Sequence, residues 1–572
     1  MMVEASPDTL SPLRAEAVAI DDLFGWFSPG IGRRGVVLCG ATGFEQLAAH
    51  RSWRDLAGRI AATGCATLRF DYPGEGDSGD AGAESVAAWV GAIRRAIRFL
   101  REEAGAEEIV LVGLRLGGTL AVLAAQEGGV DRLALLAPCR TGRAYLREMR
   151  LRAPAINALP DGATPAQEPG HLSVGGFRFG PGLVRDLSAI DLAGIAVPPA
   201  PKILLLGAES DDLARRCEAL GSDVARGPLH GLALLVGNPL FSETPEDAFS
   251  TVVDFVAQGA LPRPSGPGSV LAPARIDGAG WREEAVRFGP DLFGVHGRSS
   301  GAARGGPTVL FVQAGLSVHS GWGRQTTVLA RRLAARGVAS LRMDLRGVGE
   351  SPDRPARTSP LFAPDAPDDI GHALDHLAAR GTGPVVVVGT CSGAYAAFHA
   401  ACRDHRIAGA LLVNLYCFDW HPDDEVDAVI RGRFGRASTY AALLARGATW
   451  RRLLRREIRV AAIGGALARG GLHRIKRRWT GLFRPGPAGG SVARRVDAIR
   501  RRGAHLRLVY CAGDPGLPAV RKLGRSPERV ARRLGAPVAI IPGTDHNLGT
   551  PDAQDRLAAI LLALVDTVAN GH

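Results

Sequence analysis

The chain has 572 residues, which is too long for one ordinary hydrophobic core and predicts at least two domains. Hydrophobic residues make up 46% and charged residues 22%, a balance that is typical of globular proteins and excludes a largely disordered chain. The formal net charge of +12 is carried mostly by arginine. We expect no nucleic-acid partner, because the sequence lacks a recognisable binding module with stacking aromatic residues.

The N-terminal residues show no basic region followed by an apolar run, and the longest apolar stretches are too short to span a bilayer. We therefore expect a cytoplasmic protein. The eight cysteines are scattered, without the paired spacing that zinc sites or disulfide frameworks require. We expect every cysteine except Cys391 to be a reduced, buried thiol, and we expect neither a metal nor a cofactor.

The two halves of the chain repeat one order of predicted elements. Residues 35–80 contain an apolar strand, a glycine-containing loop, an amphipathic helix that ends at Gly64, a second strand and an Asp-x-x-Gly-x-Gly turn. Residues 308–353 repeat this series, with the helix ending at Gly337. The repetition predicts a tandem duplication, with a first domain at 1–258, a linker rich in proline and glycine at 259–280, and a second domain at 281–572.

Short apolar runs mark the predicted strands of both halves. They are VVLC, ATLRF, IVLVG, LALLA and KILLLG in the first half and TVLFV, ASLRM, VVVVG, ALLVN and LRLVYC in the second. Continuous hydrophobicity, rather than alternation, is typical of strands covered on both faces. The pattern favours an α/β fold with two mostly parallel sheets, each with helices on both faces. In such sheets the functional residues lie at the carboxyl ends of the strands.

The sequence GTCSG at 389–393 follows one of these strands and precedes a run of small helix formers. A strand–turn–helix junction is the context of a nucleophile elbow, which would place Cys391 at a helix N-terminus, where the helix dipole favours a thiolate. Asp514 and His546 follow two later strands, so the chain order is nucleophile, acid, base. We predict a triad of Cys391, His546 and Asp514.

Two alternatives stay open within this triad. Asp419 follows an earlier strand and is the alternative acid, and Ser392 is a hydroxyl beside the tip of the elbow. The first half lacks the constellation, since Arg115 stands at the elbow position of GLRLG and a permanently protonated guanidinium is no nucleophile. The position that matches His546 falls near Leu240. We expect a degenerate first domain in which Arg115 is structural or binds an anion.

With these motifs, both halves resemble α/β-hydrolase domains. The turn at 344–351 is similar to one in the serine aminopeptidase (S33-like) branch, and GLRLG followed by GRAYLREMR resembles the Arg-elbow proteins of the exosortase-associated group. Dienelactone hydrolases and polyhydroxyalkanoate synthases share a cysteine at the elbow. The resemblance implies an oxyanion hole made by the amides of Leu316 and Ser392. His319 lies in the same loop, and we expect it either to contact substrate or to be an exposed loop residue.

A basic insertion at about 416–502 occupies the place where α/β-hydrolases carry a cap. Its segment 449–479 has apolar residues at helical spacing with basic residues between them. This pattern is compatible with a solvated helix face, with binding of the phosphates of a coenzyme A or carrier-protein thioester, or with contact to an anionic membrane surface. The acidic HPDDE at 421–425 is expected to be a solvated loop and not a metal site.

The favoured function is acyl transfer or hydrolysis by the Cys391 triad, acting on an ester or thioester of a small molecule or a carrier. Two alternatives from other classes are kept. One is a conventional carboxylic-ester or peptide hydrolase, and the other is a non-catalytic tandem scaffold in which both halves are binding modules.

Overall fold

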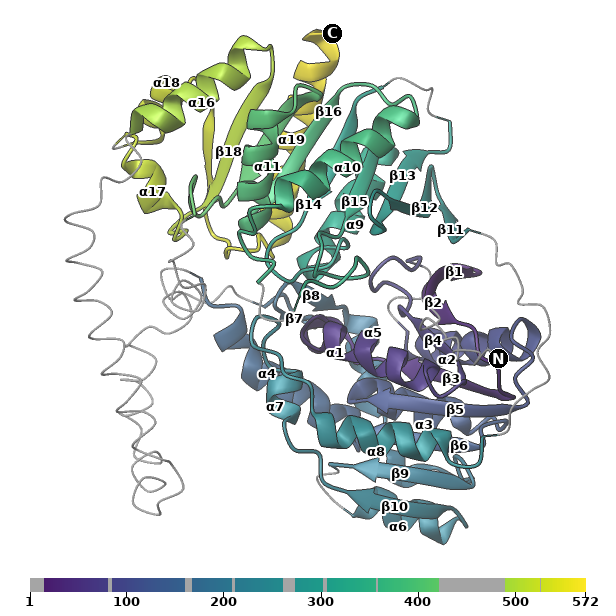
Figure 1. The fold of residues 1–572 in the computed structure, drawn as a ribbon. Helices are drawn as coiled ribbons and strands as arrows, with labels where there is room; N and C mark the ends of the chain where they lie inside the picture. Colours follow the sequence, from purple (N-terminus) through teal and green to yellow (C-terminus); the bar gives the residue numbers. More distant parts are fainter. Residues whose placement is uncertain are drawn as a thin grey trace, which may run out of the picture.

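The computed structural model describes residues 15–80, 85–159, 167–207, 211–260, 273–301, 306–355, 359–420, 489–524 and 526–571. Within these residues the chain forms two α/β domains, each built around one large sheet, and the two domains contact each other (Figure 1). The α/β fold class with two mostly parallel sheets is thereby confirmed. No described helix is long and apolar enough to cross a membrane.

The first sheet has eight strands. In spatial order they are β1 (Glu16–Ile20), β2 (Leu23–Ser28), β4 (Ala66–Phe70), β3 (Arg34–Cys39), β5 (Glu108–Leu114), β6 (Arg132–Leu136), β9 (Lys202–Leu206) and β10 (Asp223–Gly227). β1 and β2 run antiparallel to their neighbours, and the other pairs are parallel. The predicted apolar runs form β3, β4, β5, β6 and β9.

The helices of the first domain cover both faces of this sheet. They are α1 (Gly43–Ala61), α2 (Val86–Glu102), α3 (Leu116–Ala125), α4 (Gly142–Ile156), α5 (Pro181–Ala189), η1 (Leu192–Gly194), α6 (Asp212–Ala219), α7 (Leu232–Leu235) and α8 (Glu246–Ala257). Apolar side chains of α2 and α3 lie in one core, and those of α1 and α8 lie in the other. A small hairpin, β7 (Leu172–Val174) and β8 (Phe177–Phe179), stands apart from the sheet.

The second sheet repeats the order of the first. Its strands are β11 (Arg275–Gly278), β12 (Trp281–Phe288), β13 (Leu292–Ser299), β15 (Ala339–Met343), β14 (Thr308–Val312), β16 (Val385–Thr390), β17 (Ile407–Val413), β18 (His505–Cys511) and β19 (Val538–Ile541). β12, β13, β15, β14, β16, β17, β18 and β19 correspond in order to the eight strands of the first sheet. The two sheets thus share one strand order, and β11 is an additional edge strand.

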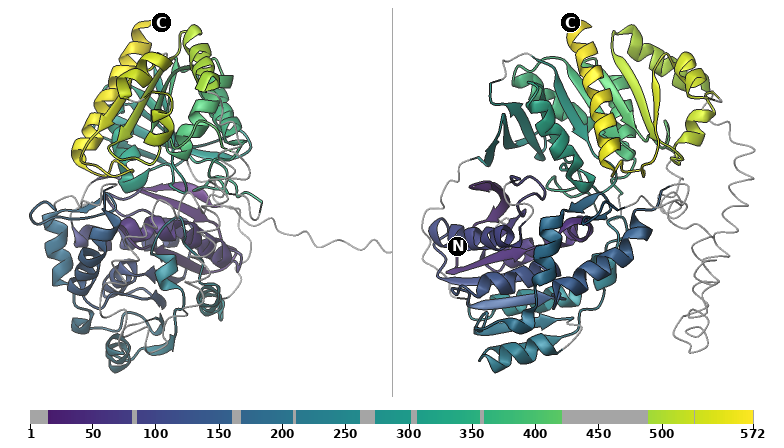
Figure 2. Two further views of the ribbon diagram at one scale, coloured as in Figure 1. Left: turned by 90° about the vertical axis from the view of Figure 1, so that its left-hand side faces the viewer. Right: turned by 180° about the vertical axis from the view of Figure 1, so that it is seen from behind.

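Helices again cover both faces of the second sheet. They are η2 (Trp322–Arg324), α9 (Gln325–Ala334), α10 (Ala366–Ala379), α11 (Ser392–Arg403), α16 (Gly489–Arg501), α17 (Leu517–Arg521), α18 (Pro527–Leu534) and α19 (Pro551–Gly571). α10, α11 and α16 pack on one face, and α9 and α19 pack on the other (Figure 2). α1 and α9 end at Ala61 and Ala334, three residues before the predicted ends at Gly64 and Gly337, which lie in the following turns with positive φ angles of 88° and 79°.

The predicted end of the linker needs correction, and most of the predicted cap lies outside the described residues. Residues 275–278 of the expected linker form β11 and pair with β12, so the second sheet begins earlier than the sequence indicated. Most of the expected cap, 421–488, lies outside the described residues, as do the acidic 421–425 and the basic 449–479. Residues 489–501 form α16, whose Val492, Val496 and Ile499 are buried against the sheet layer. They belong to the helices that cover the sheet and not to a cap.

Candidate active site

Cys391 stands at the sharp junction between β16 and α11. Its backbone angles are φ 53° and ψ −112°, a region that non-glycine residues rarely occupy and that is strained unless the surroundings enforce it. Gly393 lets the helix begin this close to the sheet, because a Cβ there would lie 2.4 Å from the carbonyl oxygen of Val312 on β14. The elbow geometry therefore depends on a glycine two residues after the cysteine.

Arg115 occupies the same junction in the first domain, between β5 and α3, with φ 53° and ψ −122°. The guanidinium is buried and donates to the Glu45 carboxylate at 3.2 Å and to the Glu148 carboxylate at 2.5 Å. Arg152 donates to the same Glu45 oxygen at 2.9 Å. Burial raises the pKa of the Glu45 carboxyl, although the two arginines oppose the rise. Carboxylates of the protein itself thus pair with Arg115, which favours a structural role over binding of a foreign anion.

Backbone contacts attach the elbow to the neighbouring strand. The Cys391 N–H donates to the Val413 carbonyl at 2.9 Å, at the carboxyl end of β17. The next residue, Asn414, has φ 50° and links three strand ends: its N–H donates to Val509 at 2.8 Å, and its Oδ1 accepts the Cys511 N–H at 2.8 Å. Its side-chain amide donates to the His546 carbonyl oxygen at 2.6 Å. Asn414 therefore joins the elbow, the acid-bearing strand and the histidine loop, a role that sequence reasoning missed.

Asp514 and His546 meet at this edge of the sheet. His546 Nδ1 lies 2.5 Å from Asp514 Oδ2, and since an ionised carboxylate can only accept, the imidazole donates from Nδ1. The other carboxylate oxygen accepts the Gly516 N–H at 2.7 Å, which fixes the orientation of the acid. This tautomer leaves Nε2 with a lone pair, as a general base requires. Asp514 is nearly fully buried, at 2% exposure.

The alternative acid and the alternative nucleophile are engaged elsewhere. Asp419 forms an ion pair with Arg495 of α16 at 2.8 Å. The Ser392 hydroxyl oxygen accepts the N–H of Gly315 at 2.8 Å and so links the helix start to the loop after β14. Asp514, rather than Asp419, is therefore the carboxylate that the structure places on the histidine, and the Ser392 hydroxyl supports the loop instead of pointing to a reacting group.

The predicted oxyanion donors lie on both sides of this link. Ser392 is the first residue of α11, where the N–H has no acceptor within the helix. Leu316 directly follows Gly315, whose φ of 59° is in the left-handed region. Among the hydrogen bonds of the described residues, the Leu316 N–H has no acceptor. The Gly315–Ser392 hydrogen bond brings the two segments together, and the oxyanion role of the Leu316 and Ser392 amides stays a prediction.

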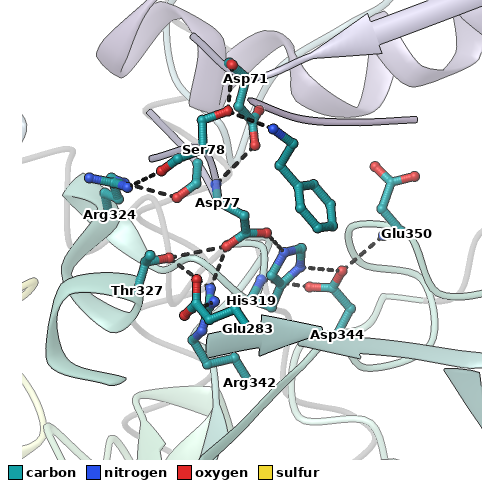
Figure 3. Close-up of polar contacts among 12 residues, drawn as sticks. Asp71, Asp77, Ser78, Glu283, His319, Arg324, Thr327, Arg342, Asp344 and Glu350 are labelled. Carbon is teal, nitrogen blue, oxygen red and sulfur yellow. Dashed lines mark hydrogen bonds and ion pairs between the residues drawn. The ribbon is translucent and has the colours of Figure 1, made fainter. Parts of the chain in front are cut away.

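His319 lies in the loop where the sequence placed it, but the expectation that it contacts substrate or solvent is corrected. The side chain is only 2% exposed. Its Nδ1 lies 2.9 Å from Asp344 Oδ2, and its Nε2 lies 2.5 Å from Asp77 Oδ2 of the first domain (Figure 3). Burial alone would lower the pKa of this imidazole, but the two carboxylates raise it well above its ordinary value. With both ring nitrogens bonded to carboxylates, no nitrogen remains for a substrate.

A pocket borders the histidine loop and is lined by both domains. Asn157, His171 and Arg178 come from the first domain, around the β7–β8 hairpin, and Asp545 and Thr550 flank His546 in the second. Asp545 itself accepts the Gly549 N–H at 2.7 Å, so it shapes the loop and does not orient the neighbouring histidine. No cluster of histidine, cysteine and acidic residues suited to a metal ion occurs within the described ranges.

Comparison with known protein families gives one match, which falls in the second domain. Residues 292–560, a little under half of the chain, match the model of the alpha/beta hydrolase family. This match agrees with the strand order, the elbow and the positions of Asp514 and His546 at strand ends. The second domain is thus similar to the alpha/beta hydrolase family over residues 292–560. No curated protein sequence matches the chain.

Solved structures give weaker likenesses. The esterase Est1E from Butyrivibrio proteoclasticus, with ferulic acid bound, is 16% identical with a TM-score of 0.32, over 43% of this chain and 100% of its own. The Pyrococcus furiosus esterase Pf2001 is 13% identical with a TM-score of 0.30, over 51% of this chain and 99% of its own. At these values the likenesses carry no argument about substrate.

Proposed function

We propose that the second domain hydrolyses or transfers the acyl group of an ester or thioester, using Cys391 as nucleophile, His546 as base and Asp514 to orient the histidine. The hydrogen bond of 2.5 Å between His546 Nδ1 and Asp514 Oδ2 carries this proposal, because it fixes the tautomer that a general base needs. The strained backbone of Cys391 at the head of α11 supports the assignment of the nucleophile.

The proposed reaction proceeds in two steps. His546 Nε2 takes the proton of the Cys391 thiol, and the sulfur attacks the acyl carbon, forming a C–S bond while the carbonyl electron pair moves to the oxygen. The amides of Leu316 and Ser392 stabilise that oxyanion. When the tetrahedral intermediate collapses, the alcohol or thiol leaves with the proton from His546. Water, an alcohol or an amine then attacks the acyl-enzyme, gives its proton to His546 and regenerates the thiol.

The first domain is proposed to be a degenerate copy. It keeps the elbow geometry at Arg115 but places an arginine there, and that arginine is paired with the Glu45 and Glu148 carboxylates. The matching order of strands in the two sheets supports descent by tandem duplication. The finer kinships, to S33-like aminopeptidases in the second domain and to exosortase-associated proteins in the first, remain proposals that rest on sequence motifs.

A mass measurement tests the proposed chemistry. The protein is incubated with a panel of acyl thioesters and simple esters, and intact and peptide masses are followed for an acyl adduct on Cys391. The adduct is expected in the wild type and in Cys402→Ala, a matched control on the same helix, and absent in Cys391→Ala and His546→Ala. Adducts from thioesters alone favour acyl transfer from a carrier, and adducts from both favour a conventional esterase. Absence of any adduct and any turnover favours the non-catalytic scaffold.

The acyl donor is proposed to be a small molecule or a carrier-bound thioester whose phosphates meet the basic segment 449–479, with an anionic membrane surface as the alternative partner. Hydrolysis of a coenzyme A thioester is compared with that of an N-acetylcysteamine thioester of the same acyl group, which lacks the phosphates. If the phosphates contact this segment, kcat/KM for the coenzyme A thioester should exceed kcat/KM for the N-acetylcysteamine thioester, and the ratio of the two should fall as the salt concentration rises. A ratio near one at every salt concentration argues against the phosphate contact.

A further inference from the structure

The two domains meet through reciprocal contacts between corresponding residues. Arg342 on β15 pairs with Asp77 in the turn of the first domain, and Arg69 on β4 pairs with Glu350 in the turn of the second, at 2.8 Å. Each arginine stands two residues before the first Asp of its Asp-x-x-Gly-x-Gly turn, and each acid stands six residues after it. All four side chains are buried. The interface thus resembles the isologous contact of a homodimer, made within one chain.

The two acids of this interface, Asp77 and Glu350, differ in their contacts beyond the arginine. In addition to its arginine, Asp77 contacts His319 at 2.5 Å and accepts from the Thr327 hydroxyl at 3.2 Å (Figure 3). His319 lies four residues after Gly315, in the loop that carries the Leu316 amide. Asp77 is therefore connected to the predicted oxyanion loop of the other domain. Glu350 instead contacts Arg69 and His50 of the first domain, so its side chain does not reach that loop.

Asp344 completes the support of the loop from the other side. Its Oδ1 accepts the backbone N–H of His319 at 2.7 Å, and its Oδ2 lies 2.9 Å from the imidazole and accepts the Glu350 N–H at 2.9 Å. The imidazole thus bridges two carboxylates, one from each domain. Arg342 and His319 hold the pKa of Asp77 well below its usual range despite burial, so this carboxylate stays charged and holds the ring firmly.

Further contacts from the first domain flank the same loop. A Cβ on Gly315 would lie 3.5 Å from the Leu240 side chain, and the ring of Phe44 packs edge-on against Trp322 at 5.9 Å between centroids. Arg324, which follows the loop with φ 61°, donates to the backbone oxygens of Gly76 at 2.9 Å and Ser78 at 2.5 Å. An arginine in the left-handed region persists only where its surroundings enforce it. Here these surroundings are residues of the first domain.

We infer that the first domain takes part in the chemistry of the second by positioning its oxyanion loop, with Asp77 as the positioning residue that acts through His319. The inference rests on the proposed function, because the loop matters for rate only if the Leu316 amide stabilises an oxyanion. Asp77 touches neither the substrate nor the triad. Its loss lets the His319 ring turn and the loop shift, and misplacement of about 1 Å near reacting groups costs up to about a hundredfold in rate.

The experiment compares Asp77→Asn with Glu350→Gln, its counterpart at the same interface. Each removes the carboxylate of one reciprocal ion pair, but only the first removes a partner of His319. Steady-state kinetics use the ester or thioester that gives turnover in the panel described under Proposed function. Asp77→Asn is expected to lower kcat ten- to a hundredfold with KM unchanged, and Glu350→Gln is expected to keep kcat within twofold of wild type. Alkylation of Cys391 by iodoacetamide needs no oxyanion hole and is expected to keep its rate in both variants.

A second measurement does not depend on turnover. Hydrogen exchange of the backbone amides of 314–319 is expected to accelerate in Asp77→Asn and to stay near wild type in Glu350→Gln. His319→Gln breaks the same contact from the other side while leaving the Asp77–Arg342 pair in place, so it replaces Asp77→Asn if that variant does not fold. It is expected to show the same loss of kcat, and the double variant is expected to lose no more than either single one.

Separate outcomes overturn the inference and the proposed function. Equal loss of kcat in Asp77→Asn and Glu350→Gln, or no loss in either, overturns the positioning role. If the wild type itself gives no adduct and no turnover, the proposed function fails, and hydrogen exchange alone decides the link. If exchange is faster in Asp77→Asn only, the contact between Asp77 and His319 still holds the loop 314–319 in place. Equal exchange in both variants would overturn this link.

Discussion

The ion pair between Arg69 and Glu350 gives a stability prediction whose size follows from the structure. Glu350 is buried, and although burial raises the pKa of its carboxyl, Arg69 and His50 lower it to about 2 from 4.5. A lowering of that size corresponds to about 3 kcal/mol of folding free energy. Glu350→Gln leaves the Arg69 guanidinium buried without its carboxylate, and breaking a buried pair in this way costs about 3–5 kcal/mol. We expect a loss of about 3 kcal/mol at pH 7.

The pH dependence has a definite sign. Because the pKa of Glu350 is lower in the folded state, the pair stabilises the protein fully above pH 4.5, and this contribution is lost as the pH falls towards 2. Glu350→Gln lacks that contribution at every pH, so the two stability curves should converge between pH 4.5 and 2. Burial also lowers the pKa of the adjacent His50 to about 4. Because Glu350 opposes this lowering, the substitution also shifts the pKa of His50, and the difference between the two proteins reports both groups.

Urea denaturation at a series of pH values, followed by circular dichroism and tryptophan fluorescence, measures this difference. A gap of less than 1 kcal/mol at pH 7 would refute the argument that the pair is buried and uncompensated. A gap that stays constant down to pH 2.5 would also refute it, because it would show that titration of Glu350 does not contribute to stability.

The remaining predictions concern the elbows and the strand ends. Gly393→Ala forces a Cβ to within 2.4 Å of the Val312 carbonyl oxygen, so it should abolish Cys391 acylation and lower the melting temperature. Gly371→Ala within α10 is the control, because a Cβ there has no neighbour within 4 Å. It should stabilise the fold by about 0.5–1 kcal/mol. Asn414→Gly keeps the left-handed backbone but frees the His546 carbonyl, and kcat should fall about tenfold or more with slower acylation in stopped-flow assays. Arg115→Met should leave activity unchanged but cost about 3–5 kcal/mol in chemical denaturation, and adding Glu45→Gln should recover part of this loss because the buried carboxylate is then neutral.

The parallel strands, and the places of Cys391, Asp514 and His546 at strand ends, could be predicted because their signals are local. Buried parallel strands appear as continuous apolar runs, and the elbow, Asp514 and His546 each directly follow such a run. β12 was missed because its sequence, WREEAVRF, contains charges that a buried strand does not usually carry. The structure explains them: Glu283 of β12 is buried against Arg331 and Arg342, at 2.7 and 2.6 Å. Charged pairs in an interface look in sequence like solvated residues.

The environment of His319 could not be predicted for a related reason. Asp77 lies 242 residues away in sequence, in a turn whose acidic residues are typical of exposed loops. The only available signal was the corresponding position of Asp77 and Glu350 in the repeated turn, and that signal indicates neither a partner nor a contact between domains. Asn414 likewise shows no special pattern beyond its place after a strand. Long-range polar contacts of this kind require the three-dimensional arrangement of both domains.

The reciprocal pairing of the two turns has a consequence for assembly. Arg342 would meet an acid at the same place whether it faced Asp77 of the first domain or Glu350 of a second copy of its own domain, since the two acids occupy corresponding positions. The ion pair between arginine and acid thus does not by itself distinguish a neighbour on the same chain from one on another chain. The covalent connection between the domains supplies that preference, because it holds the correct partner at a high effective concentration. In this sense the connecting segment determines specificity as well as joining the domains.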